Sequence, residues 1–82
     1  MAKKKLQVVE RKLGREKAFG QCYQNLGLIE IDPRQTAKEY LDTLIHEMLH
    51  HELPELSERE VERLANTFSH VIWKHNYRRI MC

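Results

Sequence analysis

Apolar residues recur with two different spacings along the chain, which divides it into a first part with strand character and a second part with helical character. Short runs of strand-forming residues at 6–11, 17–23 and 27–32 are separated by segments that contain glycine or asparagine, as in tight turns. In the third run, Ile29 and Ile31 share one face, as alternation along a strand requires. We therefore expect an antiparallel meander of three strands.

The second part of the chain carries start signals for two helices. Thr36 is followed three residues later by Glu39, and Ser57 is followed in the same way by Glu60. Both pairs have the form of a capping box, in which two side chains satisfy free amides at a helix start. Pro54 disfavours helical geometry at the residue before it, so it separates the two helices.

The apolar residues of these two segments follow helical spacing, with one stripe on each helix. The first stripe consists of Leu41, Leu44, Ile45, Met48 and Leu49, and the second of Val61, Leu64, Ala65, Phe68, Ile72 and Trp73. We predict helices over about 36–52 and about 57–77, preceded by a sheet over about 6–32. The expected fold is a single α+β domain spanning 1–82, in which a small three-stranded antiparallel sheet packs on a two-helix hairpin.

Composition narrows the class of protein. A chain of 82 residues has room for one modest core, and 41% hydrophobic with 32% charged residues is typical of a globular protein. No apolar run approaches the ~20 residues of a spanning helix, and no apolar stretch follows the charged start as in a secretory signal. We expect a cytoplasmic protein without a membrane partner, with Cys22 and Cys82 as free thiols. The net charge of +2 does not favour a nucleic-acid partner.

The segment His46-Glu47-Met48-Leu49-His50 lies in the first predicted helix and has the form HExxH. Two histidines four residues apart project from one helix face, so both rings can bind one tetrahedral ion. Glu47 then lies beside the open coordination position, where it can take a proton from a water activated by the metal. We predict His46 and His50 as Zn²⁺ ligands and Glu47 as the catalytic residue. The alternative is a pair of polar histidines on the exposed side of an ordinary helix.

A catalytic zinc site usually has a third protein ligand. The downstream candidates are His51, Glu52, Glu55, Glu58, Glu60, Glu62, His70 and His75. In an antiparallel helix hairpin that turns near 55–56, residues equidistant from the turn lie at the same height. Glu62 is then level with the metal, whereas Glu58 lies one turn too close to the loop. We predict Glu62 as the third ligand, with a solvated surface glutamate as the alternative. Asn66 would be level with His46 and could accept a hydrogen bond from its second ring nitrogen.

Together, HExxH and the later segment Glu62-Arg63-Leu64-Ala65-Asn66 are similar to the HExxH plus ExxA(D/N) pattern of gluzincin metallopeptidases. The chain also resembles the single-domain minigluzincins and, more loosely, SprT-like and phage-associated HExxH proteins. The resemblance implies that an edge strand before the active-site helix binds substrate in extended form, which corresponds here to Phe19, Gly20 and Gln21. The residue that such peptidases direct at the transition-state oxyanion is left open between Tyr23, His51, His70 and Tyr77.

These features predict a zinc-dependent metallopeptidase that hydrolyses a peptide or protein substrate. The alternative is a non-catalytic zinc-binding module with a regulatory or interaction role. Glu47 favours the enzyme, because a purely structural metal site has no use for a carboxylate at this position. A nucleic-acid-associated protein that uses the basic residues near both chain ends is a third possibility, ranked below these two.

Overall fold

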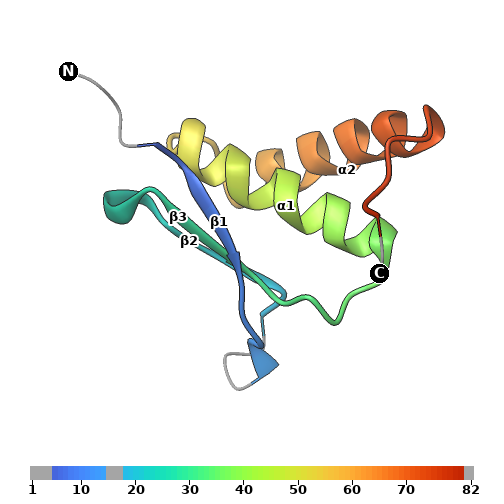
Figure 1. Cartoon of the computed structure of the whole chain (residues 1–82). Helices are drawn as coiled ribbons and strands as arrows, with labels where there is room; N and C mark the ends of the chain where they lie inside the picture. The colour runs from blue at the N-terminus through green and yellow to red at the C-terminus, as the bar shows by residue number, and fades with distance from the viewer. Residues whose placement is uncertain (1–4, 15–17, 81–82) are drawn as a thin grey trace.

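The computed structural model describes residues 5–14 and 18–80. Its elements follow in the order β1 (Gln7–Glu10), β2 (Gly20–Tyr23), a short 3-10 helix η2 (Gln24–Leu26), β3 (Leu28–Ile31), α1 (Ala37–Glu52) and α2 (Glu58–Lys74). The three strands form one sheet, and the two helices form a hairpin beside it (Figure 1). The fold is α+β, as the sequence predicts. Neither of these two helices is long and apolar enough to cross a membrane.

The sheet is mixed, and the predicted antiparallel meander is therefore wrong. Strand β2 pairs antiparallel with β3, but β1 pairs parallel with β3, and the strand order is β1-β3-β2. The turn between β2 and β3 is tight, with Gly27 in the left-handed region at φ 61°. The segment between β1 and β2 is longer than a hairpin turn, so nothing forces those two strands to pair. This order leaves β2 at an edge of the sheet.

Both helices begin at the predicted capping boxes. The Thr36 hydroxyl oxygen accepts from the Glu39 amide at 3.2 Å, and the Glu39 carboxylate accepts from the Thr36 amide at 3.0 Å. Ser57 and Glu60 exchange the same two bonds. Because these bonds satisfy amides that the helix itself leaves free, the start of each helix is fixed locally.

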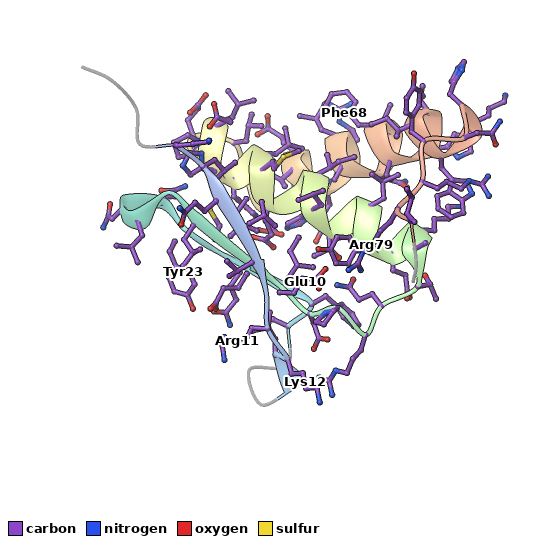
Figure 2. The ribbon with its side chains drawn as sticks, in the orientation of Figure 1. Glu10, Arg11, Lys12, Tyr23, Phe68 and Arg79 are labelled. Carbon is purple, nitrogen blue, oxygen red and sulfur yellow. The ribbon has the colours of Figure 1, made fainter. Side chains whose placement is uncertain are left out.

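Helix α1 is the central element, because it contacts both the sheet and α2 (Figure 1). The buried apolar side chains are Leu13, Ile29, Ile31, Ile45, Val61 and Ala65. Ile29 and Ile31 form the predicted buried face of β3. The buried face of α2 is narrower than its predicted stripe: Phe68 is 43% exposed and points away from α1 (Figure 2). Since α1 is the main partner of α2, only part of that stripe can be covered.

Asp32 fixes the end of β3 to the segment that follows β1. Its carboxylate is buried and accepts hydrogen bonds from the Arg34 guanidinium, from the Leu13 amide at 2.9 Å and from the Arg34 amide at 3.0 Å. These hydrogen bonds hold the pKa of Asp32 well below its usual range, and those from the Arg34 guanidinium have the largest effect.

Gln35 connects the same corner to α1. Its side-chain amide donates to the carbonyls of Phe19 and Asp32, and its side-chain oxygen accepts from the Thr43 hydroxyl at 2.6 Å. Gln35 is itself buried. The start of β2, the end of β3 and the middle of α1 are thereby held together by one side chain.

Replacing Asp32 by asparagine should destabilise the fold in a pH-dependent way. Because the folded-state pKa lies below the unfolded value of about 3.9, the ionised carboxylate stabilises the fold above that pH, and this contribution is lost as the pH falls below about 4. We expect a lower midpoint of urea unfolding than in the wild type near pH 7, and a shrinking difference toward about pH 3. Glu55→Gln, in the linker between the helices, is the control. A difference that is equal at both pH values would contradict this role.

Candidate metal centre

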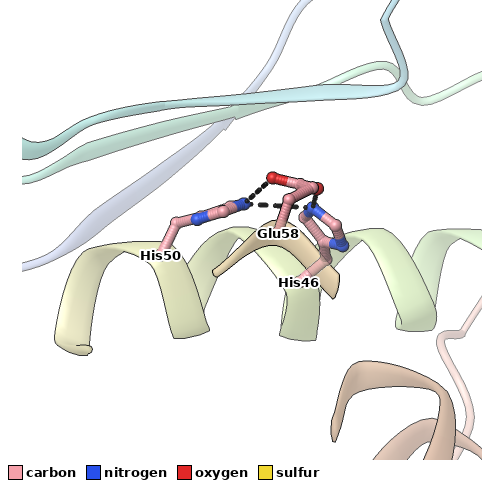
Figure 3. Close-up of side chains that lie close together, drawn as sticks. All are labelled: His46, His50 and Glu58. Atoms are coloured by element: carbon pink, nitrogen blue, oxygen red, sulfur yellow. Dashed lines mark hydrogen bonds and ion pairs between the residues drawn. The ribbon is translucent and has the colours of Figure 1, made fainter. Parts of the chain in front are cut away.

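The candidate site is formed by one turn of α1 and the first turn of α2. The Nε2 atoms of His46 and His50 lie 3.2 Å apart, and oxygens of the Glu58 carboxylate lie 2.8 Å from the first and 2.9 Å from the second. Figure 3 shows the three side chains pointing toward one another. In the described part of the chain, this is the one group of histidine, cysteine and acidic side chains whose ligand atoms converge on a common point.

The spacing of the two histidine nitrogens fits a tetrahedral zinc ion. With bonds of about 2.0–2.1 Å, ligand atoms in a tetrahedron lie about 3.3 Å apart. The His46–His50 separation is close to this value, whereas Glu58 contacts the two rings with different oxygens, Oε1 at His46 and Oε2 at His50. Two imidazoles and one carboxylate form a donor set that occurs in catalytic zinc sites and leaves a fourth position free.

Glu47 lies beside this group without belonging to it. The residue is 8% exposed, and among the described residues no hydrogen bond or ion pair holds its carboxylate. Burial raises the pKa of Glu47, while His46 and His50 act in the opposite direction and Glu58 raises it further. The residue is largely buried and lines two open cavities, and carboxylates whose pKa is raised by burial occur preferentially at functional sites.

Strand β2 approaches α1 closely at Gly20. A Cβ atom at this position would lie 2.7 Å from Cγ2 of Thr43 and 3.0 Å from Cγ of Glu47, so the close approach requires glycine. Gln24 in η2 adds a second link, because its Nε2 donates to the His50 carbonyl at 2.6 Å. The edge of the sheet is thus fixed against the turn of α1 that carries the HExxH motif.

Two open cavities flank Glu47. The first has a volume of about 370 Å³ and is lined by Gly20, His46, Glu47 and further residues of α1 and α2. The second, of about 390 Å³, is lined by Cys22, Gln24, Asn25, Glu47 and His50. Strand β2 extends from the first cavity at Gly20 to the second at Cys22. An extended chain beside β2 would therefore pass Glu47 with one cavity on either side.

Glu58, and not the predicted Glu62, completes the converging group with the two histidines. Glu62 lies one turn further along α2, where it lines the first cavity with His46 but stays outside the group. The height estimate assumes parallel helices, whereas the axes of α1 and α2 diverge from their linker (Figure 1). The sequence holds a signal for Glu58, which precedes the buried Val61 by three residues and Ala65 by seven, so all three share one helix face.

Asn66 is not placed as the sequence predicts. It lines a separate cavity with His70, and no hydrogen bond joins its side chain to His46 within the described ranges. The divergence of the two helices is again the reason, because Asn66 lies two turns beyond Glu58. His70, one candidate for the oxyanion residue, lines this separate cavity and neither of the two cavities beside Glu47.

The three other candidates for the oxyanion residue also lie outside these two cavities. Cys22 faces the second cavity, so Tyr23 points to the opposite face of the sheet (Figure 2). There its hydroxyl donates to Gln21. His51 lies with Nδ1 2.6 Å from the Glu52 carboxylate. Tyr77, beyond the end of α2, lines another cavity. Asn25 is an amide donor that does line the second cavity, and no motif in the sequence identifies it.

Phe19, Gly20 and Gln21, the predicted substrate-binding edge strand, lie at the start of β2 or directly before it. In the described sheet, β2 has a neighbour on one side only, and Phe19 and Gly20 line the first cavity. Gln21 points to the other face, toward the Tyr23 hydroxyl. In the expected meander β2 would have been the middle strand, so the observed order is what leaves its edge free.

The cysteines add no ligand to the group. Cys22 is a free thiol, as predicted, and burial, with a smaller contribution from the nearby Glu47 carboxylate, raises its pKa. Its sulfur does not belong to the converging group. Cys82 lies outside the described residues.

Comparison with protein families, with curated proteins and with solved structures finds no match to this chain. Evidence for a function therefore comes from the HExxH motif and from the geometry around Glu47.

Zinc affinity should distinguish Glu58 from Glu62. Glu58→Ala removes one of three ligands, so we expect weaker zinc binding by about 100-fold or more, beyond the roughly 10–100-fold effect of losing an outer-shell partner. Glu62→Ala should change the affinity by less than about threefold, because its carboxylate stays outside the group. Competition with a chromophoric chelator measures both. A larger loss in Glu62→Ala than in Glu58→Ala would restore Glu62 as the third ligand.

Proposed function

We propose that the protein is a zinc-dependent metallopeptidase that hydrolyses peptide bonds in a peptide or protein substrate. The observation that supports this most strongly is the position of Glu47, whose largely buried side chain lines both cavities beside His46, His50 and Glu58. A site that only stabilised the fold would have no use for this carboxylate. Zinc, when bound, would polarise the scissile carbonyl and lower the pKa of the attacking water.

The remaining roles belong to the residues of the chain. His46, His50 and Glu58 would hold the ion across the contact between α1 and α2. The free edge of β2 offers backbone amides and carbonyls to an extended peptide, in the manner of strand addition. Gly20 brings this edge close to Glu47, so the peptide would lie within reach of the carboxylate.

Glu47 acts as the proton carrier in this proposal. Its ionised carboxylate accepts a proton from the attacking water, and the resulting acid donates that proton to the amine of the leaving fragment. Burial, which raises the pKa of Glu47, makes the carboxylate a stronger base. The same raised pKa keeps the proton available for the second transfer.

A non-catalytic zinc-binding module is the second candidate. Its support is that Tyr23, His51, His70 and Tyr77 all lie outside the cavities beside Glu47. An ion shared by α1 and α2 would also stabilise a chain with a small core. The peptidase requires the Glu47 carboxylate for proton transfer, whereas the non-catalytic module does not.

Glu47→Gln should separate zinc binding from catalysis. We expect the variant to retain one zinc per chain, because Glu47 is not a ligand, and to lose proteolysis by about 10²–10⁴-fold, because glutamine cannot carry the proton. Metal analysis and cleavage of a mixed peptide library measure the two properties on the same samples. Glu55→Gln is the matched control and should retain both. If zinc-loaded wild type and Glu47→Gln are equally inactive toward the library, the non-catalytic module is correct instead.

A further inference from the structure

The cavity shared by His46 and Glu47 has an acidic wall. Besides Glu47, its lining includes the carboxylates of Glu39 and Asp42 from α1 and of Glu62 from α2. No lysine or arginine is among the described residues that line it. Its volume of about 370 Å³ lies near the lower end of the roughly 300–1,000 Å³ of ligand sites.

These carboxylates are largely free of protein partners. Asp42 and Glu62 make no hydrogen bond or ion pair with any residue in the described ranges, and Glu39 is engaged only at its capping box, by Thr36. Glu47, at 8% exposure, points into the same cavity without a partner. Like charges that face one space without a counter-ion repel one another, so the cavity is complementary to a positively charged group.

The arrangement does not fit a second metal ion. The ligand atoms of Glu39, Asp42 and Glu62 do not converge as those of His46, His50 and Glu58 do, and the latter are the one such group within the described residues. A cation whose charge lies at the end of a long side chain does not require such convergence. Phe19, which is 65% exposed and lines the same cavity, offers an apolar and aromatic surface to the methylene groups and the charge of such a side chain.

We infer that this cavity is a specificity subsite for a basic side chain of the substrate, so that the protein cleaves peptides beside lysine or arginine. The inference rests on the proposed peptidase function for its cleavage step. The basis is the position of Asp42 and Glu62 at one end of the path that an extended peptide takes along β2, next to Glu47. A zinc ion does not cancel this charge: with Glu58 bound it leaves one positive charge against Glu39, Asp42, Glu47 and Glu62.

Matched peptides test the inference on the zinc-loaded wild type. Internally quenched peptides that differ only by arginine, alanine or glutamate at one position are compared, with that position placed on either side of the scissile bond. We expect kcat/KM for the arginine peptide to exceed that for the alanine peptide by about tenfold on one side, as two exposed ion pairs of up to ~1 kcal/mol each allow. The glutamate peptide should be the poorest substrate, and high salt should reduce the preference.

Single substitutions of the cavity carboxylates test whether they cause the preference for arginine. Glu62→Gln and Asp42→Asn should each reduce the ratio of arginine to alanine cleavage by about threefold, and Asp42→Lys should reverse it in favour of glutamate. Glu55→Gln, which removes a charge outside the cavity, should leave the ratio unchanged. Equal cleavage of all three peptides, or a ratio insensitive to both cavity variants, would overturn the subsite while leaving the peptidase in place.

A binding measurement separates this outcome from failure of the proposed function. Fluorescence anisotropy of the same peptides, labelled and mixed with zinc-loaded Glu47→Gln, reports binding without cleavage. Tighter binding of the arginine peptide that weakens by about threefold when Glu62→Gln is added would support the subsite even if the wild type cleaved no peptide. Equal binding of the arginine and glutamate peptides would contradict it.

Discussion

Helix α1 contacts the sheet on one side and α2 on the other, and the candidate site exists because one turn of this helix meets both. On the side of α2, His46 and His50 reach the first residue of the neighbouring helix, Glu58. On the side of the sheet, Glu47 lies against Gly20 of β2. The potential ligands and the proposed catalytic carboxylate therefore belong to different packing contacts. A shift of α1 along either contact would separate the candidate metal site from the strand edge.

Polar contacts add to a small apolar core in holding α1 in place. Gln35 links α1 to the ends of two strands, and Gln24 binds the carbonyl of His50. Few buried apolar side chains come from α2. An ion held between His46, His50 and Glu58 would add a bond between the helices at the point where α2 begins. In this chain, metal binding and stability of the helix hairpin are expected to be linked.

Sequence features with local causes were predictable. The two capping boxes and the HExxH spacing depend on residues within one or two turns, and the structure has both helices where these features place them. The order of the strands depends on distant contacts, such as the hydrogen bond from the Leu13 amide to Asp32. No local sequence pattern indicates which strands pair, so the predicted antiparallel meander was wrong.

The candidate site could be predicted from the sequence only where a single motif carries it. His46, Glu47 and His50 follow from one motif, whereas the choice between Glu58 and Glu62 depends on the angle between two helices. That angle is set by how Val61 and Ala65 pack against α1, and distance from a turn does not determine it. The acidic wall of the first cavity could not be predicted from the sequence either. Glu39 is fully explained as a cap, Asp42 belongs to no motif, and only the fold brings them near Glu62.

The central claim is that His46, His50 and Glu58 together bind one zinc ion. Zinc K-edge X-ray absorption of the zinc-loaded protein tests the donor set most directly, because the spectrum reports ligand distances, separates sulfur from nitrogen or oxygen and shows bound imidazole rings. The zinc affinity of Glu58→Ala assigns the carboxylate. We predict only nitrogen and oxygen ligands at about 2.0–2.1 Å, with the outer-shell scattering of two imidazole rings. A spectrum without imidazole scattering, or one with a sulfur ligand at about 2.3 Å from Cys22, would contradict the claim.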